Sequence, residues 1–428
     1  MGIENISTHL TTSMFAIIVF IAIHANKPYF PKNLCARSTP EKLKITSAMK
    51  SSSFIKKFYH QNKKLVNLAK TQQIKYNPIV MDNTEIIKDA EKYLGKKLQC
   101  IVPFEHLMFF QDGKVYSCCP AIVNKYTFGN IFDQSYEELW NGEKAKAFRQ
   151  SVLDGNYQFC DLKSCITRNL KEDGRFNSEK IYDSAEVTEL PKMVHFNIDE
   201  TCNARCIMCR DKSIHNPEWI KKYEENIDKT LIPLLKNAET VYLNGSGELF
   251  ASNLCKNLVK KITATYPNIK FDLITNGLLA NAKNFEEIGL LGKVQSIEVS
   301  MHSAHKETYE KIVRGGNFDT LMENLKFISE MKKSGKLDFF WLNFVVNSYN
   351  YQEMIDFQKL ANELVATTNF WEYRTWGEVE LDKRYDEVAI FEPTHPNYPK
   401  YLEVINNDIF KSPNCNINAK LRPLSTVS

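Results

Sequence analysis

Three cysteines at C-x3-C-x2-C spacing, Cys202, Cys206 and Cys209, form the stretch of this sequence best suited to metal chemistry. They follow an apolar run, 193–198, that predicts a strand, so the thiols are expected on the loop that leaves it. A loop can bring three sulfurs around one small object. Thiolates bind iron or zinc, and three are one fewer than a closed structural site uses. The spacing therefore predicts a metal site with one coordination position left for another ligand.

A second group of cysteines lies upstream, within residues 100–165, and comprises Cys100, Cys118, Cys119, Cys160 and Cys165. In a chain of 428 residues, clustered thiols indicate metal binding more than disulfides. The total of 11 cysteines is odd, which also disfavours complete pairing. We therefore expect a reducing compartment, the cytoplasm.

The elements that must position these thiols follow an alternating pattern from residue 193 onward. Strands are expected at 193–199, 240–244, 270–275, 296–300, 339–346 and 369–375, and helices at 218–236, 253–266, 284–291, 319–333 and 352–364. Such alternation predicts a parallel α/β fold with right-handed crossovers. Because six strands are visible rather than eight, the expected architecture is a partial (β/α)6 TIM-like barrel.

Composition divides the chain into five expected segments. They are a basic leader, 1–83; a small cysteine-rich α+β module, 84–170; a polar linker, 171–190; the barrel, 191–376; and a C-terminal extension without clear periodicity, 377–428. Within the module we expect a helix at 84–97, a hairpin formed by 107–110 and 114–117, and a helix at 135–153. The extension is expected to pack across an edge or the mouth of the barrel.

The leader carries most of the basic character. Residues 1–81 hold 12 of the 55 basic residues and 2 of the 51 acidic ones, so the remainder is net acidic. Nothing in that remainder marks a general nucleic-acid binder. The apolar segment 14–23 is too short for a membrane span, which needs about 20 residues. Three interpretations stay open: a weak membrane anchor, a targeting peptide, or an extension upstream of the true start codon.

The C-x3-C-x2-C loop after the first barrel strand resembles that of the radical S-adenosylmethionine (SAM) superfamily. In that family three cysteines hold a 4Fe–4S cluster, and the amino and carboxylate groups of SAM chelate the fourth iron. The resemblance thus implies Cys202, Cys206 and Cys209 as cluster ligands. Zinc remains an alternative on the residues alone, since His195 and His215 are nearby in the sequence.

The resemblance also implies SAM contacts at the ends of later strands, and the candidates are Gly245, Ser246, Gly247, Glu248, Asn276, Ser300 and Arg314. The segment 245–248 resembles the family's Gly-Gly-Glu element, which contacts the SAM amino group. Ser300 stands where the family places a ribose contact, and Arg314 suits the SAM carboxylate. Ordinary turns and a surface arginine are the alternatives. His302 replaces an acid of many relatives and is expected to be a partly buried structural histidine, with a substrate-facing role as the alternative.

The upstream cysteine module resembles a SPASM-type auxiliary-cluster domain. It precedes the barrel here, whereas in relatives it usually follows, and it ends in C-x4-C where relatives usually have C-x2-C. The resemblance implies an auxiliary 4Fe–4S cluster held by Cys100, Cys118, Cys160 and Cys165, with Cys118 favoured over Cys119. A zinc site with the same four thiols is the alternative. The isolated cysteines, Cys35 and Cys255, are expected to be plain thiols, and Cys415 receives no role.

Together the resemblances imply an oxidoreductase or maturase. It would cleave SAM reductively to a 5′-deoxyadenosyl radical and abstract hydrogen from a peptide or protein side chain. The alternatives are an enzyme that modifies a small molecule or sugar nucleotide, and a non-catalytic zinc-binding scaffold. The implied partners are a peptide or small-molecule substrate and an electron donor such as flavodoxin or ferredoxin. Weak membrane association through 14–23 stays one of the three open interpretations of that segment. No catalytic acid or base is assigned.

Overall fold

The computed structural model describes residues 83–120, 126–162, 165, 176, 180–212, 214–243, 246–375 and 379–422. Residues 78–428 belong to one compact unit, and 1–77 to another, none of which is described. The expectations for the leader, for segment 14–23 and for Cys35 therefore lie outside the described residues. Within those residues, none of the helices combines the length and the apolar character needed to cross a bilayer.

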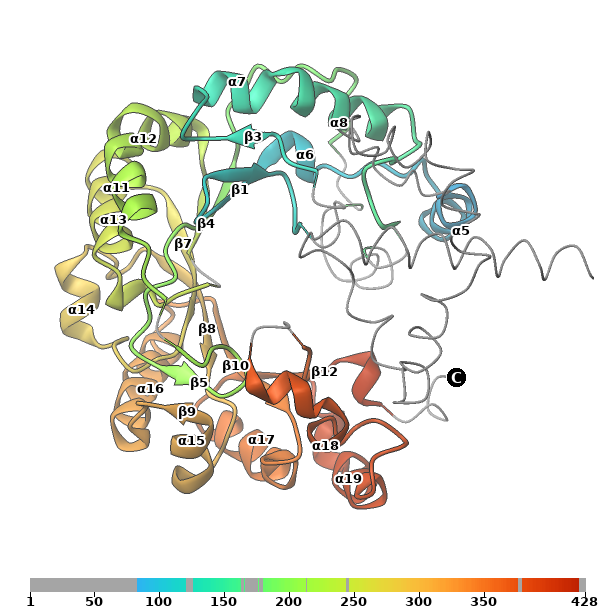
Figure 1. The fold of residues 1–428 in the computed structure, drawn as a ribbon, viewed down its shortest axis with the longest axis vertical. Coiled ribbons are helices and arrows are strands. Elements are labelled where there is room, and N and C mark those ends of the chain that lie inside the picture. The colour runs from blue at the N-terminus through green and yellow to red at the C-terminus, as the bar shows by residue number, and fades with distance from the viewer. Residues whose placement is uncertain are drawn as a thin grey trace, which may run out of the picture. The chain divides into compact units, whose positions relative to one another are not determined.

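A ten-stranded sheet forms the centre of the described unit (Figure 1). Eight of its strands run parallel, in the order β12-β11-β10-β8-β7-β6-β4-β1, and β2 and β3 continue the sheet antiparallel beyond β1. The strands are β1 His106–Phe110, β2 Lys114–Tyr116, β3 Gly129–Asn130, β4 Met193–Asn197, β6 Thr240–Leu243, β7 Lys270–Thr275, β8 Val294–Ser300, β10 Phe339–Val346, β11 Thr367–Glu372 and β12 Cys415–Ile417. The fold is α/β with a mostly parallel sheet, as predicted.

The six predicted strands are present as β4, β6, β7, β8, β10 and β11. Two further parallel strands flank them, so the expected count of six is too low. β1 comes from the cysteine module, where it was expected only as part of a hairpin. β12 comes from the C-terminal extension, pairs with β11 and forms this edge of the sheet. Its three residues are too few to show periodicity, which is why the sequence did not reveal it.

Helices pack on one face of the sheet (Figure 1). They are α11 Pro217–Asn226, α12 Ile232–Leu234, α13 Asn253–Thr265, α14 Ala282–Glu287, α15 Lys306–Ile312, α16 Phe318–Lys333, α17 Met354–Glu363, α18 Tyr385–Val388 and α19 Tyr398–Ile405. Beneath them lie strand side chains such as Val194, Leu243 and Phe344, each at most 1% exposed. The predicted helix 218–236 is instead α11, a π-helical turn and α12, because Pro233 cannot donate a backbone hydrogen bond.

The cysteine module contributes α5 Thr84–Leu94, α6 Val102–Glu105, α7 Tyr136–Asn141 and α8 Glu143–Leu153. The predicted single helix 135–153 is two helices that meet at Gly142. A Cβ at Gly142 would lie 2.2 Å from the carbonyl oxygen of Glu138, so the close packing of the turn requires glycine. Ser135 caps α7 in a reciprocal capping box with Glu138.

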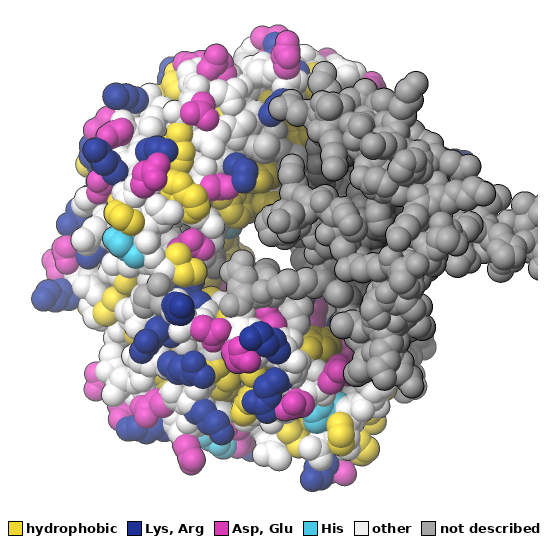
Figure 2. Space-filling model, viewed as in Figure 1, with side chains coloured by type: hydrophobic (Ala, Val, Ile, Leu, Met, Phe, Trp, Pro, Cys, Tyr) yellow, Lys and Arg dark blue, Asp and Glu magenta, His cyan; other side chains and the backbone are white. Residues whose placement is uncertain are grey.

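Lys and Arg side chains are interspersed with Asp and Glu over the face seen in Figure 2.

Candidate metal centres

The C-x3-C-x2-C loop leaves the carboxyl end of β4 and is fixed by a short antiparallel ribbon. The ribbon pairs β5, Arg205–Cys206, with β9, Val313–Arg314, and the backbone N–H of Ile207 donates to the carbonyl of Ile312 at 2.9 Å. The loop then turns tightly, because the backbone N–H of Cys209 donates to the carbonyl of Cys206 at 2.9 Å. A loop tethered in this way holds its thiols in one place.

The three thiols of this loop influence one another. Burial, together with the neighbouring Cys209 and Cys202, raises the pKa of Cys206 to about 12. Burial also raises the pKa of Cys202. Cys202 and Cys206 therefore hold their protons at neutral pH, and metal binding must displace them.

The donor set fits an iron–sulfur cluster. Within the described part of the chain, no three His, Cys, Asp or Glu side chains converge on the position of one metal ion. A 4Fe–4S cluster makes a different demand, because each thiolate binds its own iron. Three thiols spread along one loop meet that demand in number and chemical type.

The loop after β6 packs directly against the cysteine loop. A Cβ on Gly247 would lie 2.4 Å from the carbonyl oxygen of Asp199 and 2.7 Å from that of Thr201. The next residue, Glu248, donates its backbone N–H to the Thr201 carbonyl at 2.8 Å. Gly247 is therefore required for this close approach. Gly245 lies outside the described residues.

The carboxylate of Glu248 is buried and binds the end of the neighbouring strand β7. Its oxygens accept hydrogen bonds from the Thr275 hydroxyl at 2.8 Å and from the Asn276 backbone N–H at 2.7 Å. Burial raises the pKa of Glu248 to about 7, although these hydrogen bonds lower it. The structure thus shows Glu248 joining two strand ends, and its contact with SAM stays a prediction.

Asn276 reaches the cysteine loop itself. Its side-chain amide donates to the Asn203 side chain at 2.8 Å and to the Cys202 sulfur at 3.6 Å. Ser300 ends β8 and pairs in register with Asn343 of β10. Arg314 is exposed on β9, directly opposite Arg205. The strand ends thus bring Ser246, Gly247, Glu248 and Asn276 to the loop, whereas Arg314 lies on its ribbon.

His302 has a structural role. Its backbone is left-handed, at φ 62°, and its Nδ1 accepts a hydrogen bond from the Val345 backbone N–H at 3.2 Å. The Asn350 side chain donates to the His302 carbonyl at 2.8 Å. Burial lowers the pKa of His302 to about 4, so the imidazole is neutral at neutral pH. These contacts match the expected structural histidine.

Four upstream thiols line one cavity, and they are Cys100, Cys118, Cys160 and Cys165. Burial raises the pKa of Cys160, and the other three thiols raise it further. Cys119 is exposed and does not line the cavity. The remaining lining is largely apolar and includes Phe148 and Val152 of α8. Four thiols in a largely apolar cavity suit a thiolate-bound cluster.

Two residues that support this cavity were missed in the sequence. Tyr157, with a left-handed φ of 50°, donates its hydroxyl to the Leu98 carbonyl at 2.8 Å and accepts from the Cys100 N–H at 3.2 Å. Arg149 is fully buried and donates to the Pro103 carbonyl at 2.7 Å. Neither residue type in isolation indicates such a role, because both are usually partly exposed.

A ladder of polar side chains was also missed; it lies on the face of the sheet opposite the described helices, here called the inner face. The Tyr242 hydroxyl donates to Glu298 at 3.3 Å, and the amide of Asn343 donates to Glu298 at 3.0 Å. The amide of Asn369 donates to Asn343, and that of Asn416 to Asn369, each at 3.0 Å. Asn343 interrupts an otherwise apolar run, which was the one available signal.

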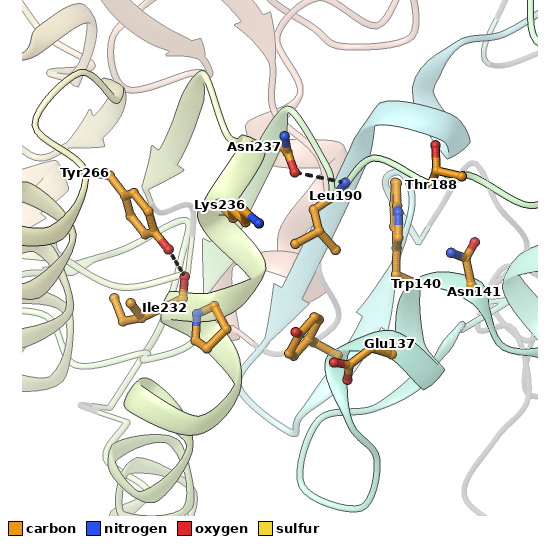
Figure 3. A pocket seen from close by; sticks show the side chains of 11 residues that line it. Glu137, Trp140, Asn141, Thr188, Leu190, Ile232, Lys236, Asn237 and Tyr266 are labelled. Carbon is orange, nitrogen blue, oxygen red and sulfur yellow. Dashed lines mark hydrogen bonds between the residues drawn. The ribbon is translucent and has the colours of Figure 1, made fainter.

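A separate open cleft of about 630 Å³ lies between α7 and the segment around α12 (Figure 3). Trp140 and Asn141 line one side of it, and Ile232 and Lys236 line the other. The indole N–H of Trp140 donates to the Glu189 carbonyl at 2.8 Å. No cysteine lines this cleft, so it is separate from both thiol groups.

Comparison with known families accounts for both thiol groups. Residues 196–361 match the radical SAM superfamily, and residues 100–166 match the SPASM iron–sulfur cluster-binding domain. The chain contains a radical SAM domain and a SPASM domain. A radical SAM domain binds a 4Fe–4S cluster and SAM, and a SPASM domain binds auxiliary iron–sulfur clusters. The predicted cofactors are confirmed, and so is the order of the two domains, with SPASM first.

Curated relatives share the radical SAM assignment. The chain is 25% identical over 210 residues to GTP 3′,8-cyclase of Lactiplantibacillus plantarum, covering 46% of this chain and 58% of that one. It is 27% identical over 191 residues to GTP 3′,8-cyclase of Petrotoga mobilis, covering 43% and 56%. The chain thus spans less than two thirds of the length of these relatives.

Among solved structures, native anSMEcpe with bound AdoMet and Cp18Cys peptide aligns at a TM-score of 0.32 and 17% identity, covering 53% of this chain and 62% of that one. This overlap is too low to carry an argument about function.

Proposed function

We propose that this chain is a radical SAM enzyme whose SAM-binding cluster is held by Cys202, Cys206 and Cys209. One observation carries the proposal: the cysteine loop, the loop after β6 and the end of β7 meet at the carboxyl ends of adjacent parallel strands. Glu248 binds Thr201 on one side and Asn276 on the other. Active sites of parallel α/β barrels gather at these strand ends.

A 4Fe–4S cluster held by Cys202, Cys206 and Cys209 would supply one electron for reductive cleavage of SAM, which would yield methionine and a 5′-deoxyadenosyl radical able to abstract hydrogen from the substrate. The chain's own residues bind and orient SAM and the substrate, and they exclude water from the site. Gly247 lets the loop after β6 approach the cysteine loop, and Asn276 fixes the position of Cys202. The same elements support SAM contacts for Ser246, Gly247, Glu248 and Asn276, with Gly245, Ser300 and Arg314 as further candidates.

We assign the auxiliary cluster to Cys100, Cys118, Cys160 and Cys165. The shared cavity supports this set, and the exposure of Cys119 supports the choice of Cys118. Radical SAM enzymes take electrons from a reductant, and a flavodoxin or ferredoxin is the proposed donor.

For the substrate we propose a peptide or protein side chain. The inner face offers carboxylates and amides from mid-strand to the carboxyl ends, including Asp272, Glu298 and Asn343. Among the residues of the described parallel strands, the inner face carries one Lys or Arg, which is Lys270 at the amino-terminal end of β7. Carboxylates and amides pair well with peptide N–H groups and amines, and poorly with a triphosphate.

A small-molecule substrate is the second candidate, because the named curated relatives are GTP 3′,8-cyclases. Adding GTP to the assay distinguishes a peptide substrate from a small-molecule substrate. If the substrate is a peptide, GTP at millimolar concentration leaves the rate of 5′-deoxyadenosine formation unchanged. A GTP-dependent increase with a new nucleotide product would select the second candidate.

Anaerobic reconstitution followed by a 5′-deoxyadenosine assay tests the enzyme assignment. The full chain should hold about eight iron and eight sulfide if both sites bind 4Fe–4S clusters. Dithionite and SAM should then yield 5′-deoxyadenosine, and Cys206→Ala should yield none while Cys255→Ala behaves as the wild type. Zinc without sulfide after reconstitution would instead support the non-catalytic scaffold.

A further inference from the structure

Arg210 directly follows the last cysteine of the loop, and its side chain is buried, at 8% exposure. The guanidinium donates to the carbonyl oxygen of Glu200 at 2.5 Å and to the carbonyl oxygen of Ser246. One side chain therefore joins the start of the cysteine loop to the loop after β6, and it belongs to the residue next to the last cysteine.

The charge of Arg210 has no ion-pair partner among the residues that the structure describes. The hydrogen bonds of the guanidinium to Glu200 and Ser246 both go to neutral backbone carbonyl oxygens. A buried cation is costly unless an opposite charge lies close to it. Deprotonated cysteines holding a cluster would supply that charge.

We propose that Arg210 is a positioning residue that offsets the negative charge of the cluster held by this loop. It also keeps the loop after β6 in place against the cysteine loop. The proposal rests on the proposed function. Hydrogen bonds to cluster sulfurs and nearby charge set the reduction potential of iron–sulfur clusters, and a cation favours the reduced, more negative form. Removing the guanidinium should therefore make the cluster harder to reduce.

The test compares Arg210→Met, Arg210→Lys and the matched control Arg205→Met in the full reconstituted chain. Arg205 lies on the same loop but is exposed. The readout is the midpoint potential from an EPR-monitored redox titration, following the signal that SAM addition alters. Arg210→Met should lower the ratio of reduced to oxidised cluster at least tenfold at a fixed potential, a shift of about 59 mV for one electron.

Arg210→Lys should recover at least half of that shift, because lysine keeps the charge and loses only the forked geometry. Arg205→Met should match the wild type. An Arg210→Met cluster with wild-type iron content and an unchanged potential would overturn the inference.

If Arg210→Met loses its iron, the iron that each variant retains in the presence of an iron chelator is compared. This comparison shows whether the cluster is held by the charge of Arg210 or by its hydrogen bonds to the Glu200 and Ser246 carbonyls. Equal iron loss from Arg210→Lys and Arg210→Met would show that the hydrogen bonds to the two carbonyls, and not the charge, retain the iron. That result also overturns the inference. Iron retained by Arg210→Lys supports it. A wild-type chain without iron and sulfide would instead overturn the proposed function.

Discussion

Cys118 and Cys119 are adjacent in the sequence, yet their environments differ. Cys118 lines the cavity with Cys160, whereas Cys119 is exposed. Both residues lie beyond β2, which ends at Tyr116, and the bend that follows places the Cys118 thiol at the cavity and leaves Cys119 exposed. The proposed choice of Cys118 as ligand therefore rests on the local backbone, at the scale of a single residue.

Cys160→Ala should remove the iron of the auxiliary site, about four atoms per chain, because a cluster of this kind uses four thiolates. Cleavage of SAM at the other site should remain measurable. Cys119→Ala is the matched control and should keep full iron content. Iron and sulfide analysis of both variants gives the answer, and unchanged iron in Cys160→Ala would remove this residue from the ligand set.

His302 gives the folded chain a pH dependence. Its pKa is about 4 when folded, and that of an unfolded-chain histidine is about 6.5. Below pH 6.5 the unfolded chain takes up a proton that the folded chain does not, so stability falls until the pH reaches about 4. The loss should be about 3 kcal/mol, since each pKa unit is worth about 1.4 kcal/mol.

His302→Asn should abolish this loss, because asparagine tolerates the left-handed backbone and its Oδ1 can accept from Val345. Denaturant unfolding between pH 4 and pH 7 measures the difference between the variant and the wild type. The exposed His305 provides the control, and His305→Asn should keep the loss. A His302→Asn chain with the same pH dependence as the wild type would contradict the assignment.

At the scale of elements, the site depends on how closely two loops approach. The loop after β6 touches backbone atoms of the segment after β4 at Gly247. Backbone atoms cannot move aside as a flexible side chain can. Hydrogen bonds from Thr275 and Asn276 to Glu248 then add the end of β7 to the same group. Three strand ends are thus locked together by one glycine and one carboxylate.

Gly247→Ala should separate these loops and cost about 1–3 kcal/mol of stability, as overpacking does. It should also lower the iron retained by the cysteine loop. Gly335→Ala is the control, since a Cβ there meets nothing within 4 Å and only the positive φ of 69° opposes it. Thermal unfolding and iron analysis of the two variants test this prediction. A Gly247→Ala chain that keeps its iron would show that the close approach at Gly247 is not needed to hold the cysteine loop.

At the scale of the whole described unit, the SPASM and radical SAM domains share one sheet. β1 pairs in parallel with β4 over five residues, and Phe109 contacts Phe196 with ring centroids 5.4 Å apart. Arg149 also holds the linker that leads to β4, by donating to the Ala185 carbonyl at 3.2 Å. The auxiliary thiols are therefore attached to the barrel through continuous backbone pairing.

A chain that begins at residue 186 should lose this support. Without β1, the strand β4 becomes an edge strand with unpaired backbone groups, which promotes aggregation. We expect this chain to form oligomers or aggregates in size-exclusion chromatography with light scattering. A chain that begins at residue 78 should instead be as monodisperse as the full chain. A monodisperse chain from residue 186 with an unchanged unfolding temperature would show that β1 is dispensable.

The sequence by itself determined the chemistry and most of the sheet. The spacing of Cys202, Cys206 and Cys209 after a strand identified the thiol loop, and it did so because ligand spacing and hydrophobic periodicity are local properties. Strands such as 270–275 and 339–346 were predicted with the bounds that the structure shows. The bounds of longer strands with strong apolar patterns can therefore be predicted with little ambiguity.

Only the tertiary structure decided which distant residues meet. The pairing of β1 with β4, the contacts of Arg210 with Glu200 and Ser246, and the burial of Arg149 join segments separated by 10 to 87 residues. Such contacts leave no periodic signal, because they depend on packing and on buried polar groups finding partners after the chain has folded. The cysteine spacing thus predicted the metal chemistry, and packing decided which residues surround it.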